Sequence, residues 1–227
     1  MIQFESVTKK YASHLALEDI NLKIEKGEFV FIVGASGAGK STLLKLITRE
    51  ILPTSGKILF NGEDITKIPN NKIPILRRKI GTVFQDFKLL LSRTIFENVA
   101  VPLEVLGYKD ADIEREVSQI LEKVGILEKA NDFPTQLAGG EIQRTAIARA
   151  IISKPEVLLA DEPTGDLDPK NSLSVVGLLD KISQETQTTV LMATHNAHVV
   201  NEFKKRVVVL QKGKIVKDEK EGRYETG

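Results

Sequence analysis

The sequence contains no cysteine among its 227 residues. The chain can therefore form neither a disulfide framework nor a metal site built from thiolates, which fits a reducing compartment. It also lacks an apolar run of the roughly 18 to 20 residues that a membrane-spanning helix needs. Residues 1–10 alternate charged and apolar side chains and hold no apolar signal-peptide core. We expect the protein to stay where it is made and to reach a membrane only through a partner.

Neither sign of charge is in excess, because 32 Lys and Arg residues face 31 Asp and Glu residues and leave a net charge of +1. A balance this close to neutral gives no general attraction to a polyanion, so we expect no nucleic-acid partner. The apolar fraction of 41% is large enough for a buried core in a chain of this length.

The pattern of apolar residues predicts an α/β protein with a helical middle. Short apolar runs that suit buried strands occur at 29–33, 57–60, 80–84, 157–160, 189–193 and 206–210, and β-forming residues also dominate the N-terminus. Helical spacing occurs at 40–49, 94–125, 139–153, 169–184 and 197–203. The alternation of strands and helices after Pro155 favours a parallel sheet covered by helices.

A glycine-rich segment joins the predicted strand at 29–33 to the predicted helix at 40–49. It matches G-x-x-x-x-G-K-[ST], the phosphate-binding loop or P-loop. Glycines let successive backbone N–H groups point at one anion, and the N-terminal end of the helix adds positive potential. The alternative is a glycine-rich turn with a chance lysine, and the strand–loop–helix context disfavours it.

The chemistry of this loop assigns roles to single residues. Lys40 should reach the β- and γ-phosphates of ATP, and the Ser41 hydroxyl should bind Mg²⁺. The predicted ATP-binding residues of this segment are Gly34, Ala35, Ser36, Gly37, Ala38, Gly39, Lys40, Ser41 and Thr42.

Two carboxylates end the predicted strand at 157–160. Ligands of open parallel sheets bind at the carboxyl ends of the strands, so both acids should lie beside the P-loop. Asp161 can hold Mg²⁺ through water, and Glu162 can orient or deprotonate an attacking water. Ordinary solvated acids are the alternative, and the P-loop upstream makes it unlikely. His195, after the strand at 189–193, could sense the γ-phosphate, although a lone histidine there is more often structural, as His14 and His198 are expected to be.

A second glycine pair opens the predicted helix at 139–153, in the order Leu-Ala-Gly-Gly-Glu followed by Ile-Gln-Arg. This segment resembles the signature motif of the nucleotide-binding domain of ABC ATPases. Tyr11, Gln85 and His195 stand where that family has its adenine-stacking aromatic, its Q-loop glutamine and its switch histidine. The matching signature residues are Leu137, Ala138, Gly139, Gly140 and Glu141, and the matching D-loop acids are Asp166 and Asp168.

The resemblance covers essentially the whole chain and implies its fold and domain organisation. It implies an α/β fold with a P-loop NTPase (RecA-like) core, an N-terminal antiparallel β subdomain and an inserted α-helical subdomain. Residues 1–227 would form one ATP-binding domain. Residues 1–85 and 156–227 would make the nucleotide-binding core, and residues 86–155 would make the helical insertion with the signature motif.

The resemblance also implies an ATPase that works as a pair. Glu162, His195 and Gln85 would be catalytic. Mg²⁺ would bind with ATP through Ser41, Gln85 and, by way of water, Asp161. Each ATP would lie between the P-loop of one copy and the signature motif of a second copy, in a homodimer that ATP assembles.

Within the family, the segments at 29–34, 83–90 and 93–100 look most like ATPases of bacterial cell division. The implied role is to move an integral membrane partner that regulates cell-wall hydrolysis, at the cytoplasmic face of the cell membrane. Lipoprotein-release and macrolide-export ATPases share the segment at 160–165 and remain alternatives. A soluble ABC protein acting on nucleic acid or iron–sulfur assembly is disfavoured by the neutral charge, by the lack of a long coiled coil and by the lack of cysteine.

The membrane partner is expected to dock along residues 86–96, which run from Asp86 to Phe96 and include three consecutive leucines. Exposed leucines in a loop are costly, and in the family this zone accepts a short helix. The alternative is that these side chains pack inside the helical insertion.

The signature motif departs from the family at Ala138, where serine is usual. Loss of one hydrogen-bond donor to a developing charge can cost on the order of 3 kcal/mol, so hydrolysis should be slower. A nucleotide-gated binding module with weak hydrolysis is therefore a further alternative. Asp166 stands where this branch usually has asparagine and adds a negative charge at the dimer seam.

Overall fold

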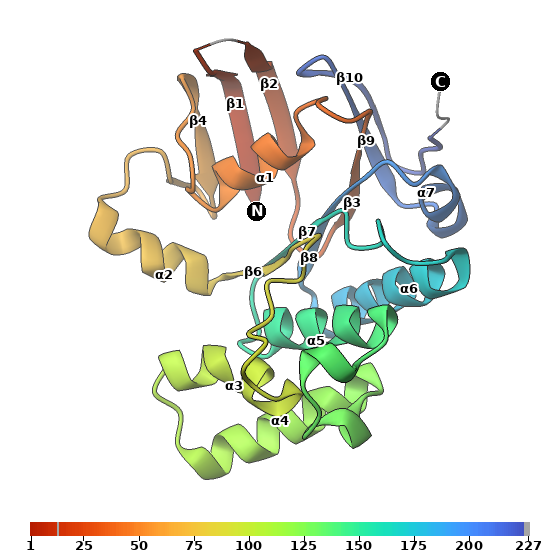
Figure 1. The fold of residues 1–227 in the computed structure, drawn as a ribbon. Helices are drawn as coiled ribbons and strands as arrows, with labels where there is room; N and C mark the ends of the chain where they lie inside the picture. The colour runs from red at the N-terminus through yellow and green to blue at the C-terminus, as the bar shows by residue number, and fades with distance from the viewer. Residues whose placement is uncertain (13, 225–227) are drawn as a thin grey trace.

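The protein is described by a computed structural model that covers residues 1–12 and 14–224. Residues 13 and 225–227, which the predicted single domain includes, lie outside the described part. The strands form two sheets, and the helices gather mainly at the opposite end of the molecule from the N-terminal sheet (Figure 1).

The first sheet is antiparallel and has four strands in the order β2-β1-β4-β5. Its strands are β1 (Ile2–Lys10), β2 (Leu15–Ile24), β4 (Ser55–Phe60) and β5 (Glu63–Asp64). This sheet is the N-terminal antiparallel unit that the family resemblance implied.

The second sheet has six strands in the order β10-β9-β3-β8-β7-β6. Five strands run parallel, and only β10 is antiparallel to its neighbour β9. Its strands are β3 (Phe29–Val33), β6 (Ile80–Val83), β7 (Val157–Asp161), β8 (Thr189–Thr194), β9 (Arg206–Gln211) and β10 (Lys214–Glu219).

The parallel sheet lies between two hydrophobic cores because its central strands are apolar on both faces. In β3, Phe29, Phe31 and Val33 point into one core, and Val30 and Ile32 point into the other. The first core includes the helical end of the molecule, and the second includes the antiparallel sheet and α1 (Lys40–Ile47). The ends of β3 and β7, where the P-loop and the two carboxylates begin, are therefore held in a sheet that is packed on both faces.

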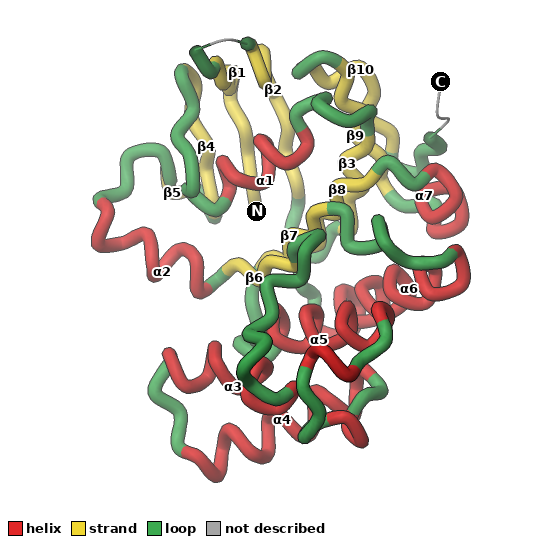
Figure 2. Tube along the Cα trace, viewed as in Figure 1, coloured by secondary structure: helices red, strands yellow, loops and turns green. Residues whose placement is uncertain are grey.

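The remaining helices either accompany strands of the parallel sheet or form the helical end of the molecule. Helix α2 (Ile73–Arg78) precedes β6, and α6 (Pro169–Thr186) and α7 (Ala197–Phe203) follow β7 and β8. Helices α3 (Ile95–Val105), α4 (Asp110–Val124) and α5 (Gly139–Ile151) pack together at the end away from β1 and β2 (Figure 2). Single turns of 3₁₀ helix lie at Asn70–Lys72, Leu127–Lys129 and Pro134–Gln136.

Local sequence explains where the helical end starts and breaks. Thr94 and Glu97 form a capping box, in which the Glu97 backbone N–H donates to Thr94 Oγ1 and the Thr94 backbone N–H donates to a Glu97 carboxylate oxygen. The predicted helical stretch at 94–125 is two helices, because Gly107 adopts φ +77° and reverses the chain between α3 and α4.

The predicted strands and helices are present, with ends that differ by a few residues. The sequence analysis did not predict β5, α2 or β10. Strand β10 is almost wholly exposed and rich in charged residues, so it carries no apolar signal. Within the described residues, no helix combines the length and hydrophobicity that crossing a lipid bilayer requires.

Candidate active site

The loop between β3 and α1 forms the floor of a cavity of about 570 Å³. Two glycines of this loop are required sterically. A Cβ on Gly34 would lie 2.3 Å from the carbonyl oxygen of Leu210, and a Cβ on Gly39, at φ +109°, would lie 2.7 Å from that of Ala16. The cavity is lined by Ala35, Ser36, Gly37, Gly39, Lys40, Ser41 and Thr42 together with His14, Ala16, Gln85, Glu162, His195 and Tyr224.

Lys40 is a buried cation held inside its own loop. Only 7% of the residue is exposed. Its Nζ donates to the carbonyl oxygens of Gly34 at 2.8 Å and Ala35 at 3.3 Å, and it lies 3.3 Å from Glu162 Oε1. A buried ammonium that already faces carbonyl and carboxylate oxygens is well placed to take a phosphate as an anionic partner.

Ser41 and Asp161 meet across the site from two different elements. Ser41 Oγ, in the first turn of α1, donates to Asp161 Oδ1 at the end of β7 over 3.1 Å. Burial raises the pKa of the Asp161 carboxyl; the Ser41 hydrogen bond opposes this shift in part, and the neighbouring Glu162 carboxylate adds to it. The pair offers a hydroxyl and a carboxylate, which are ligands that Mg²⁺ accepts when phosphate and water complete its shell.

Glu162 is the centre of the polar cluster. It adopts φ +48°, and its side chain is only 12% exposed. Its Oε1 lies 3.3 Å from Lys40 Nζ and 2.9 Å from His195 Nδ1, and its Oε2 accepts the His195 backbone N–H at 3.3 Å. The predicted catalytic acid and the predicted switch histidine are therefore in direct contact, beside the P-loop lysine.

Gln85 lines the same cavity from a strained turn. Phe87 and Lys88 both adopt the left-handed conformation, at φ +57° and +50°. Arg149 of α5 donates to the carbonyl oxygens of these two residues, with both donor–acceptor distances 2.7 Å. Burial lowers the pKa of Arg149. Arg149 was not predicted from the sequence, because nothing in its spacing points to the turn that it holds.

The signature segment does not line the P-loop cavity among the residues that the structure describes. Ala138 precedes α5, and its backbone N–H donates to Glu141 Oε2 at 2.9 Å. A Cβ on Gly139 would touch Leu167, and one on Gly140 would approach Asn171. Leu137, the first residue of this segment, packs partly buried against the core that includes the helical end.

The D-loop lies between Glu162 and α6. Asp168 caps α6 by accepting the Asn171 backbone N–H at 3.0 Å, and its other oxygen accepts from the Asn171 side chain. These hydrogen bonds, led by the one from the Asn171 backbone, hold the pKa of Asp168 below its usual value. Asp166 is exposed. Asp168 has a structural contact in the single chain, and Asp166 remains available to a partner.

The aromatic side of the cavity differs from the predicted arrangement. Tyr11 is not among the lining residues; it stacks on His14 with ring centroids 5.3 Å apart and an angle of 23° between the rings. His14, which the sequence analysis interpreted as structural or solvated, lines the cavity instead. Tyr224 also lines it, and its position at the far end of the chain gave no signal.

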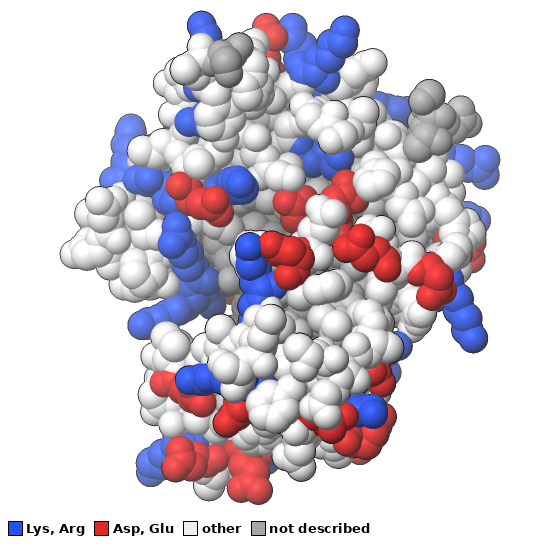
Figure 3. All heavy atoms as spheres, viewed as in Figure 1, with Lys and Arg blue, Asp and Glu red and all other residues white. Residues whose placement is uncertain are grey.

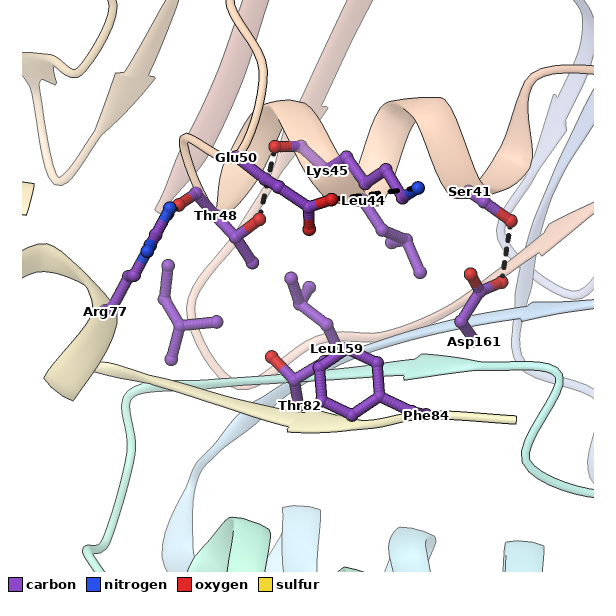
Figure 4. Close-up of a pocket in the computed structure, with 11 residues that line it drawn as sticks. Ser41, Leu44, Lys45, Thr48, Glu50, Arg77, Thr82, Phe84, Leu159 and Asp161 are labelled. Atoms are coloured by element: carbon purple, nitrogen blue, oxygen red, sulfur yellow. Dashed lines mark hydrogen bonds and ion pairs between the residues drawn. The ribbon is translucent and has the colours of Figure 1, made fainter. Parts of the chain in front are cut away.

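A second cavity, of about 270 Å³, lies behind the Ser41–Asp161 pair (Figure 4). Leu44 of α1, Thr48 directly after α1, Thr82 of β6 and Leu159 of β7 line it together with Arg77 and Phe84 (Figure 4). Ser41 and Asp161 line this cavity, and the hydrogen bond between them lies in its wall. Anything that enters it would therefore touch the elements that hold the nucleotide site.

The sequence is similar to that of known ATP-binding proteins. The model of the ABC transporter family matches residues 17–165. The Cell division ATP-binding protein FtsE of Bacillus subtilis is 51% identical over 99% of this chain and 98% of its own length. The FtsE protein of Escherichia coli is 48% identical over 95% of this chain and 97% of its own length.

Solved structures agree with the sequence comparison. The ATP-binding cassette MJ0796, in a dimeric post-hydrolysis state bound to ADP and Pi, matches with a TM-score of 0.89 at 35% identity over 99% of this chain and 100% of that one. A second dimeric structure of MJ0796 matches with a TM-score of 0.88 at 36% identity over the same shares of the two chains. The predicted fold class is therefore confirmed, and the chain belongs to the ABC transporter family as one of its ATPases.

Proposed function

We propose that the chain is the ATPase subunit of a cell-division complex whose membrane partner is of the FtsX type. The observation that carries the proposal is the cluster of Lys40, Glu162 and His195 beside the P-loop, combined with 45 to 51% identity to proteins named FtsE over almost the whole chain. In this role the protein works at the cytoplasmic face of the cell membrane and is held there by its partner.

ATP binds with its phosphates on the P-loop, and Lys40 turns from the Gly34 carbonyl to the phosphate oxygens. Glu162 orients or deprotonates the attacking water, and His195 contacts the γ-phosphate. The short distances from Glu162 to both Lys40 and His195 support this division of roles. Gln85 joins them from the loop that Arg149 holds.

Mg²⁺ would be held by Ser41 and Gln85 and, through water, by Asp161. The oxygen-rich donor set fits the ion, since Ser41 Oγ and Asp161 Oδ1 already lie 3.1 Å apart. The ion would neutralise charge on the phosphates. The burial that raises the pKa of Asp161 also favours a cation beside it.

A second copy would complete the site with Leu137, Ala138, Gly139, Gly140 and Glu141. The start of α5 presents free backbone N–H groups to an anion. In one chain this segment lies outside the P-loop cavity, which supports a site shared between two copies in the homodimer. The dimers of MJ0796 support the same arrangement.

The membrane partner would dock along residues 86–96. In this loop Leu90 is 43% and Leu91 64% exposed, whereas Phe87, Leu89 and Phe96 pack partly against the core. The side chain of Asn98, fully buried, fixes the loop by accepting the Leu90 backbone N–H and donating to three carbonyl oxygens. Basic side chains gather on the α2 side of the face that Figure 3 shows. The proposed docking surface combines exposed leucines with a loop that Asn98 holds in place.

Slow hydrolysis is the second candidate, and Ala138 is the observation that favours it. The chain keeps Glu162 and His195 in contact but lacks a hydroxyl at Ala138. The protein would then act as a nucleotide-gated clamp that turns over slowly.

Two measurements test the proposal. Phosphate release from the wild type should exceed that from Glu162→Gln by at least about a hundredfold, as removal of a general base does. Purification from detergent-solubilised membranes should recover an integral membrane protein, which Leu91→Glu should release without loss of ATP binding. Recovery of a lipoprotein-release or macrolide-export permease would favour those alternatives, and equal phosphate release from wild type and Glu162→Gln would contradict the ATPase role.

A further inference from the structure

The segment that follows β10 is fixed against the body of the protein. The Gly222 backbone N–H donates to the Lys205 carbonyl oxygen over 3.2 Å. A Cβ on Gly222 would lie 2.6 Å from Val207 Cβ, so only glycine allows the chain to pass here. The segment lies on the α7 side of the molecule (Figure 1).

The Asn201 side chain holds the end of this segment with both of its polar atoms. The Tyr224 backbone N–H donates to Asn201 Oδ1 at 2.9 Å, and Asn201 Nδ2 donates to the Tyr224 carbonyl oxygen at 3.0 Å. Such a paired contact fixes the direction of the backbone as well as its position. It holds the Tyr224 backbone in place.

Tyr224 lies at the wall of the cavity that the P-loop lines. It lines that cavity together with Ser36, Lys40 and His195, and its ring also packs partly against the hydrophobic core. No other residue after β8 except His195 lines the cavity among those that the structure describes. An aromatic ring with a hydroxyl can pack against a ribose or base and can also donate to a phosphate oxygen.

Asn201 belongs to the helix that follows the switch histidine. Asn196, directly after His195, caps α7 by accepting the Val199 backbone N–H at 3.2 Å. One short helix therefore connects His195 at one end of the cavity to the Asn201 amide that holds Tyr224. A movement of His195 and a movement of Tyr224 would be coupled through α7.

We propose that Tyr224 is a further nucleotide-binding residue and that Asn201 is its positioning residue. The proposal rests on the proposed ATP-binding role of the same cavity. A bound nucleoside triphosphate contacts the Tyr224 side chain, and the C-terminal segment thereby forms one wall of the site. Asn201 acts only through Tyr224.

The test measures the dissociation constant of the full chain for Mg-ATPγS by calorimetry. Tyr224→Ala should weaken binding by about fivefold, as expected for the loss of one contact of ordinary strength. Asn201→Ala should weaken it in the same direction. The double variant should bind no more weakly than Tyr224→Ala alone, since residues that act through one another are not additive.

The matched control is Tyr108→Phe, because Tyr108 is 49% exposed and lies outside the cavity. It should bind Mg-ATPγS as the wild type does. Thermal unfolding of every variant separates loss of binding from loss of folding. If Tyr224→Ala does not unfold cooperatively, Asn201→Ala decides in its place.

Wild-type affinity in Tyr224→Ala and Asn201→Ala would overturn the inference while leaving the proposed function intact. An effect of Asn201→Ala that adds fully to that of Tyr224→Ala would overturn the positioning role. A wild-type chain that ignores Mg-ATPγS would contradict the proposed function itself.

Discussion

The contact between Arg149 and the turn after Gln85 leads to the most detailed prediction. Phe87 and Lys88 both adopt a left-handed conformation, which costs roughly 1–2 kcal/mol for each residue that is not glycine. The two hydrogen bonds from the Arg149 guanidinium are charge-assisted and contribute about 1.5–3 kcal/mol each. The bonds therefore outweigh the strain of the turn by about 1–2 kcal/mol.

Replacing Arg149 with methionine removes both bonds while keeping an unbranched side chain at this half-buried position. We expect the free energy of unfolding to fall by about 1–3 kcal/mol, in the range typical for loss of a buried hydrogen-bonded group. The turn should relax out of its left-handed conformation and move Gln85 out of the cavity. ATP hydrolysis should then fall through kcat by about tenfold, with a smaller change in KM, because Gln85 is proposed to act on the reacting groups.

Two assays check this prediction together. Steady-state hydrolysis gives kcat and KM, and limited trypsin digestion gives the rate of cleavage after Lys88. The conservative variant Arg149→Lys keeps the charge but replaces the two separate guanidinium donors with a single nitrogen, so it should lie between wild type and Arg149→Met in both assays. The reasoning is refuted if Arg149→Met hydrolyses ATP and is cleaved after Lys88 at wild-type rates.

Two further predictions concern single groups of the site. Ala138→Ser restores a hydroxyl donor and should raise kcat or lengthen the lifetime of the ATP-bound dimer. A donor aimed at developing charge can raise kcat by up to about a hundredfold. Unchanged turnover and an unchanged dimer lifetime would contradict this prediction. Asp161 has a pKa raised by burial, so the native state binds its proton more tightly than the unfolded chain, and stability falls as pH rises from the ordinary carboxyl pKa through the raised one. Asp161→Asn should therefore be more stable than wild type in urea at neutral pH and should lose that advantage below the ordinary carboxyl pKa. It should also lose Mg²⁺-dependent hydrolysis. Equal stability of the two proteins at neutral pH would contradict the expected direction of the stability change.

The sequence predicted those features that short patterns specify. The apolar run of β3 and the glycines after it predicted a strand, a loop and a helix, and Gly34 and Gly39 are indeed positions where a Cβ would collide with a carbonyl oxygen. The carboxylates after β7 were expected beside the P-loop because parallel strands end at one edge of a sheet, and Glu162 lies 3.3 Å from Lys40.

Features that depend on distant segments were not predictable in this way. Arg149 contacts Phe87 and Lys88 across 62 and 61 positions of sequence, and no local pattern marks such a pair. Tyr224 reaches the cavity from the far end of the chain, where the Asn201 side chain contacts its backbone. His14 lines the cavity and Tyr11 stacks on its ring without lining the cavity. In each case tertiary packing decided the outcome.

The central claim is that one ATP-binding surface is built from two copies of the chain, with Lys40 of one copy and the Gly139–Gly140 helix end of the other on the same triphosphate. Sedimentation of Glu162→Gln, with and without Mg-ATP, tests it most directly. The account predicts a monomer without nucleotide and a dimer with Mg-ATP, and it predicts that Gly139→Asp abolishes the dimer while leaving Mg-ATP binding to the monomer unchanged. A Glu162→Gln protein that binds Mg-ATP and stays monomeric, alone and with its membrane partner, would contradict it.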